Sequence, residues 1–261
     1  MNRPAIFITG AAAGIGRATA ELFNSKGWFT GLYDVDETGL RILRDRFGAE
    51  NCVIGRLDTT DPDAFAQALA AFWTATEHRI DVLFNNAGIA SVDDVENILL
   101  ERHHRVIDVN LKGVINGCHL ALPYLIKTPD ARVINMCSAS ALYGAPSLAV
   151  YSATKFAVRG LTEALNIEWQ RHGVCVMDIL PLFVNTPMVR QFEHTPKAVS
   201  TMGVRLTAED VAKVVMKAAT RAQWLTPVHW YPGLQSLLMH VLVKLSPSRL
   251  NRAVIKKLSG Y

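Results

Sequence analysis

The chain of 261 residues is half hydrophobic, with 27 basic and 23 acidic side chains and a formal net charge of +4 at pH 7. This length suits one large hydrophobic core, and the mild, scattered charge gives no indication of a nucleic-acid partner. No stretch of eighteen or more residues lacks charged and polar side chains, which argues against a transmembrane span.

The first apolar run begins by residue 5, which leaves no room for a signal peptide. Four cysteines show no CxxC spacing and lie mostly in apolar runs: Cys52, Cys118, Cys137 and Cys175. Such cysteines are typical core residues of a reducing compartment, so we expect a cytoplasmic protein. No metal site is expected, because these histidines lack metal-ligand spacing with acidic partners: His103, His104, His194 and His229.

Short apolar runs and helical patterns alternate along the chain. The predicted strands are 5–8, 29–33, 52–57, 80–84, 132–137, 174–180 and 225–230. The predicted helices are 15–26, 37–47, 62–77, 101–126, 149–171 and 208–221. This alternation predicts an α/β fold, a doubly wound, Rossmann-like parallel sheet of about seven strands with helices on both faces. We expect one domain, 1–233, followed by a helical C-terminal extension, 234–261.

A glycine-rich turn follows the first predicted strand. Gly10, Gly14, Ile15 and Gly16 lie between an apolar run ending at Thr9 and an amphipathic helix. Strand, turn and helix in this order place backbone N–H groups and a helix N-terminus where a pyrophosphate can bind. Glycine is needed because a β-carbon would block the phosphates. A dinucleotide site is therefore predicted at this turn.

Asp34 ends the second predicted strand, about twenty residues after the glycine turn, where the adenosine ribose is expected. A carboxylate there accepts hydrogen bonds from both ribose hydroxyls and repels a 2′-phosphate. The alternative is that Asp34 or Asp36 opens the next helix as its N-cap.

Tyr151 and Lys155 form a YxxxK pair on a predicted helix, and Ser138 lies thirteen residues before the tyrosine, at the end of a strand. A lysine four positions on shares the helix face, so its ammonium can favour the phenolate. A carbonyl oxygen needs one donor to orient it and another to exchange its proton. The alternative is a solvated pair on the helix surface.

These motifs together resemble the short-chain dehydrogenase/reductase family. The matching segments are TGAAAGIG at 9–16, NNAG at 85–88, Asn110, Ser138 and YSATK at 151–155, and the resemblance covers roughly residues 4–231. It implies that Tyr151 exchanges the proton and that Ser138 orients the substrate oxygen. Lys155 is expected to lower the tyrosine pKa and to hold the cofactor ribose. The main chain of Asn110 is expected to hold a water of a proton relay.

The resemblance also assigns cofactor contacts. It implies that Asp58 binds the adenine amino group, although a loop-capping role is equally open. The expected ribose and nicotinamide contacts are the Asn85 backbone, Ala87, Gly88, the Val184 backbone and the Thr186 hydroxyl. Leu182 departs from the family, which usually has glycine after Pro181.

The cofactor is expected to be NAD rather than NADP, because neither Ala13 nor Val35 supplies the basic side chain of NADP-preferring relatives. We expect hydride transfer between NAD(H) and a hydrophobic secondary alcohol or ketone. The alternatives are an NADP-dependent carbonyl reductase and a non-catalytic dinucleotide-binding sensor or scaffold. Apolar side chains that could line the substrate pocket are Leu142, Tyr143, Leu182, Phe183, Met188, Val189, Phe192, Val199 and Met202.

Two surfaces suggest partners. By the family resemblance, helices 101–126 and 149–171 pair with their copies, which predicts a homodimer or homotetramer. The extension 234–261 carries apolar residues at helical spacing, and after a break at Ser246–Ser248 it adds basic residues. It is expected either to pack on its own domain or a partner subunit, or to contact an anionic membrane.

Overall fold

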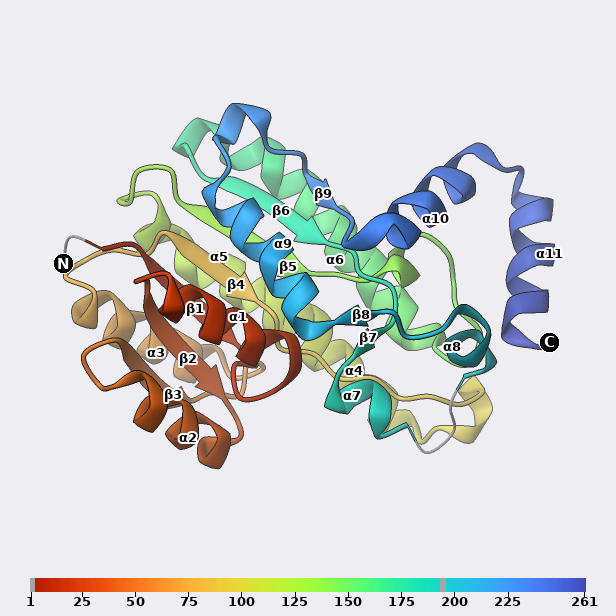
Figure 1. Ribbon diagram of the computed structural model, residues 1–261, viewed down its shortest axis with the longest axis horizontal. Coiled ribbons are helices and arrows are strands. Elements are labelled where there is room, and N and C mark those ends of the chain that lie inside the picture. Colours follow the sequence, from red (N-terminus) through yellow and green to blue (C-terminus); the bar gives the residue numbers. More distant parts are fainter. Residues whose placement is uncertain (1–2, 193–195) are drawn as a thin grey trace.

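The centre of the molecule is a parallel sheet (Figure 1). The computed structural model describes residues 3–192 and 196–261, so His194 lies outside the described residues. The strands are β1 (Ala5–Thr9), β2 (Phe29–Asp34), β3 (Cys52–Arg56), β4 (Val82–Asn85), β5 (Arg132–Met136), β6 (Cys175–Ile179) and β9 (His229–Trp230). Their order is β3-β2-β1-β4-β5-β6-β9, which confirms the predicted seven-stranded, doubly wound sheet. The order reverses between β1 and β4, and ligands of such sheets bind at the carboxyl ends of strands there.

Helices cover both faces of the sheet because side chains alternate along each strand. Ile6 and Ile8 pack with α1 (Gly14–Ser25), α2 (Glu37–Phe47) and α9 (Ala208–Thr220). Ala5 and Phe7 pack on the other face with α3 (Pro62–Ala75), α5 (Gly113–Leu125) and α6 (Ala149–Glu168). The two layers bury the dinucleotide motif's strand, β1, completely.

The shorter elements lie mainly around the carboxyl edge of the sheet. They are the 3₁₀ turns Val95–Asn97, Ala139–Ala141, Trp169–His172 and Gln223–Leu225, helices α4 (Leu100–Ile107), α7 (Pro187–Arg190) and α8 (Lys197–Met202), and strands β7 (Val184–Asn185) and β8 (Leu206–Thr207). β7 and β8 pair in parallel and form a separate two-stranded sheet.

Two predicted elements differ from the structure. The helix predicted over 101–126 is divided by a π-helical turn, Asp108–Lys112, between α4 and α5. Within that turn the Asn110 side chain donates to the Ile89 carbonyl at 2.9 Å and accepts from the Ile89 N–H at 2.8 Å. The strand predicted over 225–230 shrinks to β9, because Pro227 has no N–H to donate to a sheet ladder.

The extension forms two helices, α10 (Gly233–Leu245) and α11 (Ser248–Ser259). They project from the sheet at the end of the molecule that also holds α8 (Figure 1). Among the described residues, no helix combines the length and the hydropathy that crossing a bilayer would require.

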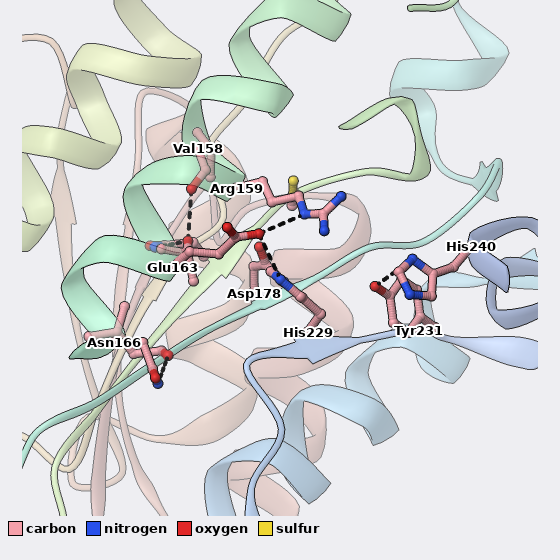
Figure 2. A network of polar contacts seen from close by, with 12 residues as sticks. Val158, Arg159, Glu163, Asn166, Asp178, His229, Tyr231 and His240 are labelled. Carbon is pink, nitrogen blue, oxygen red and sulfur yellow. Dashed lines mark hydrogen bonds and ion pairs between the residues drawn. The ribbon is translucent and has the colours of Figure 1, made fainter. Parts of the chain in front are cut away.

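A polar network joins α6, β6 and β9 away from the dinucleotide motif (Figure 2). His229 Nδ1 lies 2.8 Å from Oδ1 of the fully buried Asp178, and its Nε2 lies 3.0 Å from Glu163 Oε1. Arg159 donates to the same Glu163 oxygen at 3.1 Å. Burial opposes protonation of His229, but the hydrogen bond to Asp178 and its charge hold the His229 pKa above its ordinary value. Burial raises the pKa of Asp178.

Candidate active site

A pocket of about 570 Å³ opens at the carboxyl ends of the central strands. Segments far apart in the sequence meet there, because each follows or ends a neighbouring strand of the sheet. The predicted site residues on its wall are Gly10, Gly14, Ile15, Asp34, Asp58, Ala87, Gly88, Ser138, Tyr151, Lys155, Val184 and Thr186. Three predicted residues are not on the wall: Gly16, Asn85 and Asn110.

The glycine turn forms one end of the pocket. Gly10 and Gly14 have φ of +66° and +52°, a region that side chains with a β-carbon rarely adopt. Gly16 does not line the pocket, but a β-carbon there would lie 2.0 Å from the Gly10 carbonyl oxygen. Glycine at this position therefore allows α1 to pack closely against the turn. The first turn of α1 has no side-chain cap and no acidic residue. Gly14 and Ile15 of this turn line the pocket, and the free N–H groups of a helix N-terminus fit an anionic group such as a pyrophosphate.

Asp34 and Asp36 were each considered as a helix N-cap, and only Asp36 has that role. Asp36 caps α2, accepting from the N–H groups of Thr38 and Gly39, each at 3.1 Å. Asp34 lies on the pocket wall instead, with one oxygen accepting from the Ala12 N–H at 2.9 Å and the other from the Asp36 N–H at 3.1 Å. A carboxylate has about four acceptor positions, so Asp34 retains the capacity to bind ribose hydroxyls.

Asp58 lies on the wall in an ion pair that the sequence did not indicate. Arg105 Nη2 contacts Asp58 Oδ2 at 2.7 Å, while Asp58 Oδ1 accepts from the N–H and hydroxyl of Thr60. Partial burial opposes its ionisation, but the hydrogen bonds from Arg105 and Thr60 hold the Asp58 pKa below its usual value. Arg102 and Arg105, one helical turn apart on α4, both line the pocket. Their spacing was visible in the sequence, but nothing local tied them to Asp58.

Ser138, Tyr151 and Lys155 meet where β5 ends and α6 begins. Tyr151 shares a hydrogen bond with Ser138, and the Lys155 Nζ lies 5.5 Å from the tyrosine ring centroid. Burial raises the pKa of Tyr151 to about 12, although the Ser138 hydrogen bond acts in the opposite direction. This differs from the predicted depression of the tyrosine pKa by Lys155. The reason is that burial dominates, while the Lys155 ammonium donates to the Met136 carbonyl at 2.8 Å.

Asn110 lies behind this group, fully buried in the π-helical turn. Its Nδ2 donates to the Ile89 carbonyl and also to the Thr154 hydroxyl on α6, the latter at 3.2 Å. A β-carbon at Gly88 would lie 3.3 Å from Asn110 Oδ1 and 3.8 Å from Lys155 Nζ. Asn110 therefore ties the segment after β4 to α6; its main-chain water relay stays a prediction.

In the NNAG segment, Asn85 belongs to the sheet and Asn86 lines the pocket. Asn85 is buried and donates to Asn135 Oδ1 on β5 at 2.9 Å. Asn86 lines the pocket and donates to the Thr9 and Gly10 carbonyls, each at 3.0 Å. Asn86 thus braces the glycine turn, whereas Asn85 does not line the pocket.

Part of the pocket wall is apolar. Six of the predicted apolar residues line it: Tyr143, Leu182, Phe183, Met188, Val189 and Phe192. The other three do not: Leu142, Val199 and Met202. Val199 is instead buried within α8.

Comparison with known proteins agrees with this geometry. The sequence matches the family described as short chain dehydrogenase over residues 4–197. It is 29% identical over 218 residues to the cyclohexanol dehydrogenase of Acinetobacter sp. (strain SE19), covering 82% of this chain and 86% of that protein. It is 33% identical over 263 residues to the putative oxidoreductase SadH of Mycobacterium tuberculosis, covering 95% and 92%.

Solved structures show the same relationship. A 3-ketoacyl-(acyl-carrier-protein) reductase from Brucella melitensis complexed with NADH has a TM-score of 0.79 at 25% identity, covering 87% of this chain and 96% of that one. The closed form of a serine dehydrogenase complexed with NADP⁺ has a TM-score of 0.78 at 26% identity, covering 87% and 93%. Fold, motifs and matches agree, and the chain belongs to the short-chain dehydrogenase/reductase family of oxidoreductases.

Proposed function

We propose that the protein is an NAD-dependent oxidoreductase that interconverts a hydrophobic secondary alcohol and its ketone. The observation that carries this proposal is the meeting of Ser138, Tyr151 and Lys155 in one pocket whose wall is partly apolar. The uncapped N-terminus of α1, the glycine turn and Asp34 fit the pyrophosphate and ribose of a dinucleotide.

The chain's own groups act on the substrate oxygen. Ser138 donates a hydrogen bond that orients it, and Tyr151 removes the hydroxyl proton during alcohol oxidation and returns it during ketone reduction. As the O–H and C–H bonds break, the C=O bond forms. When bound, NAD supplies the acceptor for the hydride at its nicotinamide C4. Lys155 lies close enough to favour the tyrosinate as negative charge develops.

The test is NADH or NADPH formation with a panel of apolar and polar secondary alcohols. We expect NADH formation, with kcat/KM rising as the alcohol becomes more apolar. Binding of NAD without turnover of any alcohol or ketone would instead support a non-catalytic sensor. Faster turnover with NADP would support a carbonyl reductase.

Asp34→Asn tests the cofactor preference. We expect the ratio of kcat/KM for NAD to that for NADP to fall at least about tenfold, because the carboxylate that binds the ribose and repels a 2′-phosphate is removed. Asp36→Asn is the matched control, since Asp36 caps α2 and does not line the pocket. An unchanged ratio in Asp34→Asn would refute the assigned ribose contact.

Self-association through α5 and α6 is also proposed. Val114 of α5 is buried in the core, but Ile115 and Phe156 leave apolar side chains exposed on the two helices. A homodimer or homotetramer would cover them. Light scattering at micromolar concentration is the measurement, and a monomer would contradict this assembly.

A further inference from the structure

Helix α10 has its apolar side facing outward. Six residues at helical spacing are between 40% and 80% exposed: Leu234, Leu237, Leu238, Val241, Leu242 and Leu245. The side that faces the protein is more polar. Ser236 is fully buried, and His240 stacks on Tyr231 and shares a 3.0 Å hydrogen bond with its hydroxyl. A helix in contact with water normally has the opposite arrangement. The leucine face, defined by these six residues, therefore indicates an apolar partner.

The charge of the chain is concentrated beside the leucine face. The segment 234–261 holds five of the 27 basic residues and none of the 23 acidic ones, so it carries +5 while residues 1–233 carry −1. The basic group, defined as Lys244, Arg249, Arg252, Lys256 and Lys257, is exposed. None of the five forms an ion pair among the residues that the structure describes. An apolar face with unneutralised cations nearby complements a surface that is both apolar and anionic.

Pairing of the extension with its own copy does not supply this complement. If the leucine face lay on a two-fold axis, each extension would meet an identical one. Each would bring five positive charges and no carboxylate to the contact. An anionic lipid surface offers an apolar environment to the leucine face and negative charge to the basic group.

The extension is hydrogen-bonded to the wall of the pocket and to segments next to it. The Ser236 hydroxyl accepts from the N–H of Leu182, a wall residue, at 3.2 Å. Gln235 donates to the Met202 carbonyl at the end of α8 at 3.3 Å. The hydroxyl of Tyr261 shares a 3.0 Å hydrogen bond with Ser147, next to the wall residue Leu148. α8 and α11 lie side by side at this end of the molecule (Figure 1).

We propose that α10 and α11 dock the protein on an anionic lipid bilayer, with the leucine face in the interface and the pocket beside it. At about 1.5 Å per residue, the 13 residues of α10 are too short to span the hydrocarbon core, so the helix lies in the interface. Docking places the pocket where apolar alcohols and ketones concentrate. Only this delivery role rests on the proposed function; lipid binding does not.

Vesicle co-sedimentation of the full-length protein tests the docking. The probes are phosphatidylcholine vesicles with and without about one-third phosphatidylglycerol, at low and high salt. We expect at least about tenfold stronger partitioning to the anionic vesicles, weakened by salt. Two variants separate the contributions: Leu238→Gln/Leu242→Gln/Leu245→Gln alters the leucine face, and Arg249→Gln/Arg252→Gln/Lys256→Gln/Lys257→Gln alters the basic group. Each should lower partitioning at least about tenfold.

The matched control is Ile42→Gln/Leu99→Gln/Leu100→Gln, which removes three exposed apolar side chains elsewhere and should bind like wild type. Equal partitioning to neutral and anionic vesicles, or wild-type binding by either variant of the extension, would overturn the proposal. Loss of an oligomer in the leucine-face variant, without lipid binding by wild type, would show a self-association surface instead.

Turnover separates this proposal from the proposed function. Both extension variants should oxidise a short, water-soluble secondary alcohol at the wild-type rate, because none of the altered residues lines the pocket. With a long-chain alcohol held in anionic vesicles, their kcat/KM should fall by the same factor as partitioning. Vesicle binding without turnover of either alcohol would leave docking intact and refute the alcohol dehydrogenase assignment.

Discussion

Tyr151→Phe is expected to lower kcat about 10²–10⁴-fold, the usual contribution of a general acid–base group. The substitution removes only the hydroxyl and retains the ring, so the fold and the neighbouring Lys155–Met136 contact should persist. NAD binding should change little, because the substitution leaves the glycine turn and Asp34 unaltered. Steady-state kinetics and cofactor titration provide the two measurements.

The pocket offers a matched control for that experiment. Tyr143 also lines the wall and also loses one hydroxyl on replacement by phenylalanine, but it shares no hydrogen bond with Ser138 among the described contacts. Tyr143→Phe should therefore retain most of kcat. Comparable losses in both variants, or substantial turnover by Tyr151→Phe, would show that Tyr151 is not the proton-exchanging group.

His229→Ala is expected to lower the free energy of unfolding by about 3 kcal/mol near pH 6. Asp178 is fully buried, its Oδ2 has no hydrogen-bond partner among the described residues, and His229 is the partner of its Oδ1. Removing one member of a buried pair leaves an uncompensated group in the core. Urea unfolding of wild type and variant measures the difference. Glu163→Gln is the control: this side chain is half exposed, and its loss should cost under about 1 kcal/mol.

The loss of unfolding free energy in His229→Ala should depend on pH in a defined direction. Both ring nitrogens of His229 face carboxylate oxygens, so the folded state holds its proton and the His229 pKa lies above 6.5. A raised folded-state pKa gives a stabilisation that is complete below the unfolded pKa and disappears as pH rises through the folded one. The difference between wild type and His229→Ala should therefore shrink from pH 6 towards alkaline pH. A constant difference would contradict a His229 pKa that is raised on folding.

The sequence predicted what short segments encode. An apolar run, a glycine turn and an amphipathic helix are contiguous, and α1 with its turn forms where expected. The same holds for Tyr151 and Lys155, which share a helix turn on α6. Each of these features depends on spacing within a few residues, so local pattern was sufficient for the fold and the glycine turn, whereas the family resemblance supplied wall residues such as Asp58, Val184 and Thr186.

Contacts between distant segments were not predictable in this way. Asp178 and His229 meet only because β6 and β9 pair in that register, and Glu163 joins them from a helix. The Arg105–Asp58 pair spans 47 residues, and the Lys155 contact with the Met136 carbonyl depends on how α6 crosses β5. The apolar pattern of one segment does not indicate which distant segment it pairs with. For this reason no partner of His229 could be predicted from the sequence.

The β7–β8 ladder has a consequence for how this enzyme can change over evolution. Val184 pairs with Leu206 and Asn185 with Thr207, so the ladder joins the two ends of the intervening segment, which holds α7 and α8. The entropy of closing a loop grows only with the logarithm of its length, and a doubling costs about 0.6 kcal/mol. An insertion between the two strands therefore adds little to the free-energy cost of closing this segment. Because Met188, Val189 and Phe192 of the segment line the pocket, such an insertion can change the shape of the pocket wall at little cost in stability.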